Sequence, residues 1–273
     1  MKRANRLITV LIFIFLYIPM VVLIAASFNT GKNITHFDGF TLQQYVKLFR
    51  DDGLLELLRN SLIVSVLASL IATAFGTVAA IGINGLNPRL RKAAMSLTNI
   101  PMTNPDIVTG VSLSLLFVFV GTKLLGQRNS LTFWTLLIAH VTFNLPYVIL
   151  NIMPQLKQMD ESLTDAALDL GCTPRQAFFK VILPQLSPAI MSAFLICLTY
   201  SIDDFMISYF NCGTVETLPI AIYSMTRKKV SPEIYALSTI MFVVILTIIL
   251  ISNAMESRGY RRDQKALRGE DAA

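Results

Sequence analysis

Six long runs of apolar residues, separated by shorter polar segments, set the pattern of this chain. A transmembrane helix needs about 20 mostly apolar residues, and each run reaches that length. The runs cover residues 7–28, 61–84, 93–121, 131–153, 186–210 and 234–254. The composition agrees, because 54% hydrophobic residues and a mean hydropathy of +0.61 are typical of membrane proteins. The pattern predicts an all-α membrane protein with six transmembrane helices.

Little sequence remains for a separate soluble domain. We divide the chain into an anchor span with its loop (1–56), a membrane core (57–254) and a polar tail (255–273). The loop includes a short amphipathic segment, 42–49, which we expect to be a surface helix capped by Thr41. The second run has small residues four apart, Ala68, Ala72, Gly76 and Ala80. Small residues let helices approach closely in lipid, so this run is expected at the centre of the bundle.

The basic residues are distributed unequally between the two sides of the predicted bundle. With the N-terminus inside, the inner segments hold 14 of the 23 basic residues: Lys2, Arg3, Arg6, Arg89, Arg91, Lys92, Lys157, Arg175, Lys180, Arg258, Arg261, Arg262, Lys265 and Arg268. The positive-inside rule then places both termini in the cytoplasm. The net charge of +6 therefore indicates topology and not nucleic-acid binding. The cluster Arg227-Lys228-Lys229 would lie outside, as a local exception.

The first apolar run has two interpretations. Basic residues precede it and Ala25-Ala26-Ser27 resembles a cleavage site, as in a signal peptide. The run exceeds the 7–15 residues of a signal core, so we expect a retained anchor. The three cysteines, Cys172, Cys197 and Cys212, are too dispersed for a disulfide framework or a metal site.

Several polar residues interrupt the later apolar runs. Pro101 and Pro105 should break the third helix, and Asp106 follows the break. His140 lies within the fourth run, where we expect a structural hydrogen-bonding role. Asp203 and Asp204 lie in the fifth run, and each carboxylate in hydrocarbon costs on the order of 3 kcal/mol. Such groups normally face a polar interior or a transport path. Alternatively, the fifth span ends before Asp203, and Asp106 serves only as a helix cap.

The segment 156–185 is a polar island between the fourth and fifth runs. Ser162 and Asp165 form a capping signal for a first short helix, which Gly171 would end in a left-handed conformation. Thr173 would cap a second helix that begins at Pro174 and has Gln176 three residues after the cap. The segment therefore predicts a rigid helix-turn-helix, suited to contact with a partner.

This hairpin resembles the coupling loop of the membrane subunits of bacterial ATP-binding-cassette (ABC) importers. The matching positions, at the family's spacing, are Asp165 in place of Glu, Ala166, Ala167, Gly171, Val181 in place of Ile, Leu183 and Pro184. The resemblance implies a type I importer permease bundle whose loop contacts an ATPase subunit. The chain has no G-x-x-x-x-G-K-[ST] phosphate loop. We therefore expect no enzyme activity and no bound cofactor, with ATP used by the partner.

Other motifs narrow the resemblance to the spermidine/putrescine permeases, specifically the second of their two membrane subunits. They are Asn104-Pro105-Asp106-Ile107-Val108, His140-Val141-Thr142-Phe143, Asp203-Asp204, Leu218-Pro219 and Ile222-Tyr223-Ser224-Met225. The resemblance implies a homologous permease partner, two ATPase subunits, an extracytoplasmic polyamine-binding protein and a bacterial inner-membrane location. It also makes Asp203, Asp204, Tyr200 and Asp106 candidates for the substrate path, because carboxylates and aromatic rings attract cationic amines.

Tyr200 is three residues from Asp203 and four from Asp204, so on a continuous helix it would neighbour both. The sequence does not choose between the two carboxylates. Two other functions also place carboxylates in membrane spans. An ion-coupled transporter or channel would not need the capped hairpin. An intramembrane aspartyl protease could use Asp106 with Asp203 or Asp204, but the usual Gly-x-Gly-Asp element is absent.

Overall fold

The computed structural model describes residues 2–31, 36–124, 126, 130–160, 162–227 and 232–268 of the 273-residue chain. The described residues form helices and one isolated bridge between Asn29 and Phe40. Six helical segments are long and apolar enough to cross a membrane: Arg6–Ser27, Asp52–Asn84, Asp106–Leu124, Phe133–Gln158, Pro174–Asp203 and Glu233–Ile251. These segments confirm the predicted all-α membrane fold.

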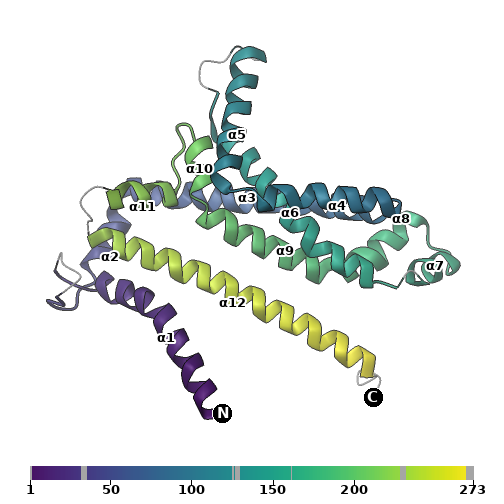
Figure 1. Ribbon diagram of the computed structural model, residues 1–273, viewed down its shortest axis with the longest axis horizontal. Helices are drawn as coiled ribbons and strands as arrows, with labels where there is room; N and C mark the ends of the chain where they lie inside the picture. Colours follow the sequence, from purple (N-terminus) through teal and green to yellow (C-terminus); the bar gives the residue numbers. More distant parts are fainter. Residues whose placement is uncertain are drawn as a thin grey trace. The chain divides into compact units, whose positions relative to one another are not determined.

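The chain forms two compact units, which we describe separately. The larger unit contains residues 60–217 and 247–273. Its helices are most of α3 (Asp52–Asn84), α4 (Pro88–Thr103), α5 (Asp106–Phe119), α6 (Phe133–Gln158), α7 (Ser162–Asp169), α8 (Pro174–Ala177), α9 (Leu183–Asp203), α10 (Met206–Asn211) and the end of α12 (Pro232–Arg268). Within this unit, α6 packs along α9 and also contacts α4, while α5 points away from that bundle (Figure 1).

The small residues of α3 lie at the centre of the larger unit, as predicted. Ala68, Ala72 and Ala80 are fully buried. A Cβ atom on Gly76 would lie 2.6 Å from Cβ of Val148 on α6. The backbones of α3 and α6 therefore approach more closely than a larger residue would permit, which is how helices gain packing contacts in lipid.

The smaller unit contains residues 1–59 and 218–246. It includes α1 (Lys2–Ser27), α2 (Gln43–Arg50), α11 (Leu218–Arg227) and the first part of α12. The Ser27 hydroxyl lies 2.7 Å from the Tyr45 hydroxyl, and Thr41 Oγ1 accepts from the Gln43 N–H. The predicted surface helix is thus confirmed, but its predicted cap is wrong: the N-cap residue is Leu42, and Thr41 lies one residue before it. The apolar side chains of α1 are exposed between Leu7 and Val22.

Two spans differ from the prediction. We expected a third span over 93–121, but α4 ends at Thr103 and α5 begins at Asp106. Pro105 lacks an N–H and disfavours helical backbone at the residue before it, and Asn104 is extended with ψ 138°. Pro101, which we also expected to break the helix, lies inside α4.

The fifth span was predicted to extend to residue 210. Instead α9 ends at Asp203, Asp204 is extended with ψ 121°, and the short α10 follows. The expected helical pairing of Tyr200 with Asp204 is therefore wrong, because Asp204 no longer belongs to that helix. The span also begins earlier than expected, since α8, a π-helical segment (Phe178–Ile182) and α9 are continuous.

Candidate functional site

The polar hairpin between α6 and α9 has the predicted helix-turn-helix form. Gly171 has a φ of +84°, and no other atom lies within 4 Å of the position of its missing Cβ. Its conformation and not its surroundings therefore favours glycine. The Cys172 N–H donates to the Ala167 carbonyl and the Gly171 N–H donates to the Leu168 carbonyl. These two bonds form a Schellman motif, which ends α7.

The two hairpin helices are capped in different ways, and only one of the caps matches the prediction. Thr173 caps α8 as predicted, with reciprocal bonds to Gln176 and with Pro174 as the first helical residue. The predicted cap at Ser162 is wrong, because Ser162 is the first residue of α7 and its N–H donates to Asp160 Oδ1 at 3.0 Å. This hydrogen bond lowers the pKa of the exposed Asp160 carboxyl.

Within the hairpin, α7 packs against α8 and against the π-helical segment that leads into α9, and two of the hairpin's small residues are buried. Ala167 and Ala177 are buried, whereas Asp165 and Ala166 face solvent and Leu170 is 86% exposed. Leu183 and Pro184 begin α9 directly after the π-helical segment. Pro184 has no N–H to bond the Lys180 carbonyl, and the Leu183 N–H instead reaches the Phe178 carbonyl. All six predicted coupling-loop residues thus lie in or beside one compact hairpin.

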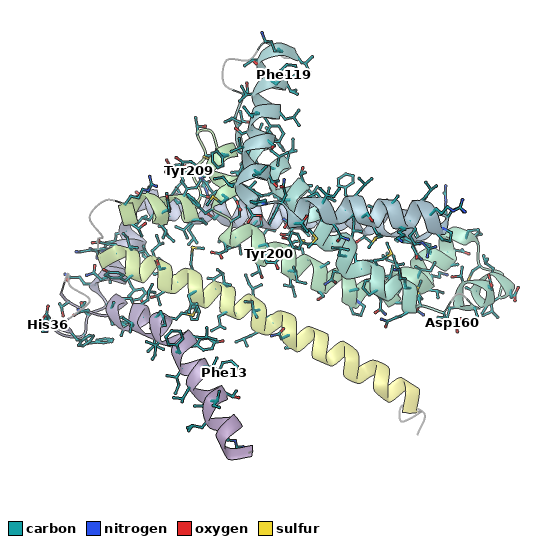
Figure 2. All side chains as sticks on the ribbon, viewed as in Figure 1. Phe13, His36, Phe119, Asp160, Tyr200 and Tyr209 are labelled. Atoms are coloured by element: carbon teal, nitrogen blue, oxygen red, sulfur yellow. The ribbon has the colours of Figure 1, made fainter. Side chains whose placement is uncertain are left out.

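The second group of candidate residues lies at the opposite end of α9. Figure 2 marks Asp160 beside α7 and Tyr200 at the far end of α9. Here the two adjacent aspartates have different surroundings. The Asp204 carboxylate accepts from the N–H groups of Ile207 (3.3 Å) and Ser208 (2.7 Å), and its side chain is only 7% exposed. Asp203 is exposed.

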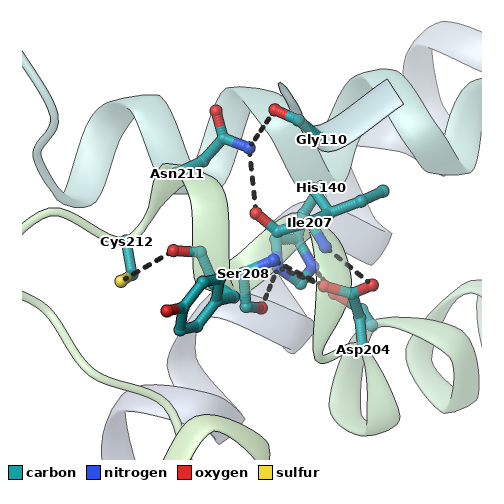
Figure 3. Close-up of polar contacts among 9 residues, drawn as sticks. Gly110, His140, Asp204, Ile207, Ser208, Asn211 and Cys212 are labelled. Carbon is teal, nitrogen blue, oxygen red and sulfur yellow. Dashed lines mark hydrogen bonds and ion pairs between the residues drawn. The ribbon is translucent and has the colours of Figure 1, made fainter. Parts of the chain in front are cut away.

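His140 on α6 completes the surroundings of Asp204 (Figure 3). Its Nδ1 lies 2.6 Å from the Ser201 hydroxyl on α9, and its Nε2 lies 2.9 Å from the Ser208 hydroxyl on α10. The same Nε2 is 3.7 Å from Asp204 Oδ2. The fully buried imidazole therefore joins three helices through hydrogen bonds. This geometry agrees with the structural role expected for His140.

Aromatic side chains surround the exposed end of α9. The rings of Tyr147 and Tyr200 have centroids 4.7 Å apart, and Phe143 lies 5.3 Å from Tyr147 and 6.5 Å from Tyr200. Tyr200 is 45% exposed. Asp106, exposed at the start of α5, is near enough to Tyr147 to interact with it electrostatically. Tyr200 thus belongs to an aromatic patch, Asp203 follows it by three residues on α9, and Asp106 lies within electrostatic range of Tyr147, whereas the Asp204 side chain is buried.

Sequence reasoning missed Phe143 and Tyr147 as members of this patch. The available signal was their spacing, because Phe143 and Tyr147 are four residues apart and share one face of a helix. Which other helix that face meets depends on the packing of α6 against α9, and local sequence does not reveal it.

The described residues include no group of three His, Cys, Asp or Glu side chains that could hold a metal ion. The three cysteines are free, and Cys197 and Cys212 are buried. Burial raises the pKa of the Cys212 thiol, which lies beyond the membrane spans, so this group stays neutral at physiological pH.

Comparisons with known proteins agree with this architecture. Residues 72–262 match the family described as binding-protein-dependent transport system inner membrane component. The chain is 38% identical over 242 residues to the spermidine/putrescine transport system permease protein PotC of Haemophilus influenzae, covering 88% of this chain and 91% of that protein. It is also 38% identical over 240 residues to the putrescine transport system permease protein PotI of Escherichia coli K12, with 84% and 82% covered.

Among solved structures, a bacterial ABC transporter involved in the import of alginate matches with a TM-score of 0.73 and 19% identity. The match covers 94% of this chain and 95% of the alginate transporter chain. At this identity the likeness concerns the fold alone. The chain therefore belongs to the family of binding-protein-dependent transport system inner membrane components.

Proposed function

We propose that the chain is the membrane-spanning subunit of an ATP-driven importer of polyamines, with spermidine and putrescine as the substrate class. The similarity of most of the chain to the PotC and PotI permeases carries this proposal. A homologous permease forms the other half of the translocation path, and separate ATPase subunits supply the energy. An extracytoplasmic binding protein delivers the substrate, and both termini of this subunit lie in the cytoplasm of a bacterial cell.

The aromatic patch at the end of α9 supports a cationic substrate. An ammonium group that leaves water loses its hydration, which is costly unless a carboxylate replaces it. Asp106 and Asp203 are exposed beside the patch and offer two such groups. The faces of Tyr147 and Tyr200 add cation–π attraction, worth about 0.5–2 kcal/mol for each favourable contact. The hydrocarbon chain between the amines would lie against the aromatic rings.

Asp203 and Asp204 have separate roles in this proposal. Asp203 belongs to the substrate path together with Tyr200 and Asp106. Asp204 already accepts two backbone N–H groups and lies beside His140, so little of its charge remains available to a passing cation. We infer that Asp204 has a structural role and stabilises the connection between α9 and α10.

The hairpin is proposed to enter a cleft of the ATPase subunit and to transmit its movement. Both of its helices begin at a capped turn, the turn between them is fixed by Gly171, and Leu170 presents an exposed apolar side chain at that turn. A rigid element transmits a displacement that a flexible loop would absorb. The second helix of the hairpin continues through α8 into α9, so movement at Pro174 can reach Asp203 along one continuous helical segment.

Reconstitution tests this function. The chain, its partner permease and the ATPase subunits are incorporated in vesicles together with the binding protein. Uptake of radiolabelled putrescine should require both ATP and the ATPase subunit. An ATPase variant that binds ATP without hydrolysing it is the matched control and should not support uptake. Uptake driven by an ion gradient without ATP would instead favour an ion-coupled transporter and overturn the proposal.

A further inference from the structure

The contact between α5 and α10 is unusually close. Gly110 on α5 is buried, and a Cβ atom there would lie 3.2 Å from the Met206 carbonyl oxygen and 3.4 Å from the Cα of Ile207. Both are backbone atoms of α10, and the Phe210 ring is equally close at 3.2 Å, so a side chain at position 110 would require α5 and α10 to separate by a few tenths of an ångström. Asn211 Nδ2 donates to the Gly110 carbonyl at 3.1 Å and to the Ile207 carbonyl at 2.9 Å (Figure 3). The amide of Asn211 thus holds the helices at this distance.

The helix α10 is itself fixed to the rest of the larger unit. His140 joins Ser208 of α10 to Ser201 of α9, and Asp204 accepts from the Ile207 and Ser208 N–H groups in the first turn of α10. The Thr135 hydroxyl on α6 donates to the Asn211 carbonyl at 3.3 Å. Because α10 cannot move freely against α6 and α9, added volume at Gly110 must displace α5.

Each of the two exposed carboxylates is close in sequence to one side of this contact. Asp106 is one helical turn before Gly110 on α5, and Asp203 is three residues before Met206. Asp106 moves with α5, whereas Asp203 stays with α9, to which α10 is bonded, so a displacement of α5 at Gly110 changes the separation of the Asp106 and Asp203 carboxylates. The two ammonium groups of one diamine can contact both carboxylates only if the separation of the ammonium groups fits the distance between the carboxylates.

We propose that Gly110 determines which length of diamine this permease accepts, by setting the spacing between Asp106 and Asp203. The inference rests on the proposed function, since it requires both carboxylates to contact substrate. Gly110 is a positioning residue in this scheme and does not touch the substrate. A larger residue at position 110 widens the spacing and shifts the preference toward longer diamines.

The test measures binding to the purified permease–ATPase complex without its binding protein, so that the binding protein's own selectivity does not contribute. Radiolabelled 1,4-diaminobutane is displaced by unlabelled 1,4-diaminobutane or 1,6-diaminohexane. The Gly110→Ala change should shift the ratio of the two affinities toward the longer diamine by about threefold to tenfold, comparable to part of one methylene's fit in a pocket. An unchanged ratio in a folded Gly110→Ala complex overturns the inference.

A second variant perturbs the same contact between α5 and α10 in a different way. Asn211→Ala removes the amide that bonds to the Gly110 carbonyl, so α5 is held less tightly against α10. The ratio of the affinities for the two diamines should then move toward one. A wild-type ratio in this variant also contradicts the inference. The matched control is Gly121→Ala, at the far end of the same helical segment, where a Cβ atom would meet Ser130. This control strains the segment far from Asp106 and should leave the ratio unchanged.

The proposed function is tested separately by Asp203→Asn. If that change weakens the binding of both diamines but Gly110→Ala leaves the ratio unaltered, only the spacing inference fails. If Asp203→Asn leaves the binding of both diamines unchanged, the assignment of Asp203 to the substrate path fails first.

Discussion

Asp203 and Asp204 are chemically identical neighbours, yet the end of α9 falls between them and separates their surroundings. The Asp203 carboxylate is exposed near Tyr200, whereas the Asp204 carboxylate accepts hydrogen bonds from two N–H groups in the first turn of α10. At the residue scale, hydrogen-bond partners and not side-chain type decide which of the two charges remains available.

This difference predicts opposite results for two isosteric variants. Asp203→Asn should weaken polyamine transport at least tenfold while the complex assembles normally, because it removes only a charge. Asp204→Asn should lower the free energy of unfolding by about 1–3 kcal/mol, because one carboxylate oxygen that accepts hydrogen bonds is replaced by an amide group that donates them. Uptake kinetics and thermal unfolding of the purified complex measure the two effects. Wild-type transport by the Asp203→Asn complex would contradict the proposed ligand role.

Gly171 is the second residue whose role depends on conformation. Its φ of +84° is costly for residues with a Cβ, by roughly 1–2 kcal/mol, and most costly for β-branched residues. Gly171→Val should therefore let ATP hydrolysis proceed with much less uptake. Gly171→Asn is the matched control, because asparagine tolerates this conformation and should retain most coupling. The ratio of ATP hydrolysed to substrate imported provides the measurement. Equal ratios in both variants would exclude a conformational role.

At the scale of elements, α7 depends on its capping carboxylate. The Asp160 pKa is lowered in the folded protein from its ordinary 3.8 by the bond from the Ser162 N–H. A carboxyl group whose pKa is lower in the folded than in the unfolded protein stabilises the folded state at pH values above its unfolded pKa. This stabilisation is lost as the pH falls through the folded pKa. The cap should therefore be intact at neutral pH and weaken only below pH 3.8.

The corresponding experiment follows amide hydrogen exchange in α7. Exchange at Ser162 and Leu163, corrected for the intrinsic rate at each pH, should accelerate as Asp160 becomes protonated. Asp160→Ala should show the faster exchange already at neutral pH, and Asp160→Asn should remain close to wild type because asparagine also caps helices. Identical exchange in wild type and Asp160→Ala would show that Asp160 does not stabilise the start of α7.

At the scale of the whole molecule, the membrane topology is still a prediction from charge. It places the hairpin in the cytoplasm, and the natural thiols offer a test. Cys172 in the hairpin is partly exposed, whereas Cys197 and Cys212 are buried. A membrane-impermeant maleimide should label Cys172 only after the cells are permeabilised. A Cys172→Ser variant serves as the control and should remain unlabelled.

Two further reporters check the same topology. A reporter fused after Ala273 should behave as cytoplasmic, and one inserted near Asn33, which lies outside the described residues, should behave as external. Labelling of Cys172 in intact cells, or the reverse behaviour of either reporter, would refute the predicted orientation.

Local features of the sequence were sufficient for the membrane class and the hairpin. The apolar runs predicted six spans because a bilayer requires long apolar helices. Gly171, Thr173 and Pro174 predicted the turn and the second helix because their preferences act within a few residues. The first cap was misassigned because Asp160 and Ser162 are both good capping residues, and only the observed bond distinguishes them.

The amino-acid sequence by itself determined that this is a helical membrane protein with a rigid hairpin and with several carboxylates among its apolar runs. Only the tertiary structure decided how those carboxylates differ. The packing of α10 against α6 placed His140 beside Asp204, and the packing of α6 against α9 brought Phe143 and Tyr147 beside Tyr200 near the exposed Asp203. The physical reason is range: caps and turns depend on neighbours in sequence, whereas burial and charge pairing depend on helices that are distant in sequence.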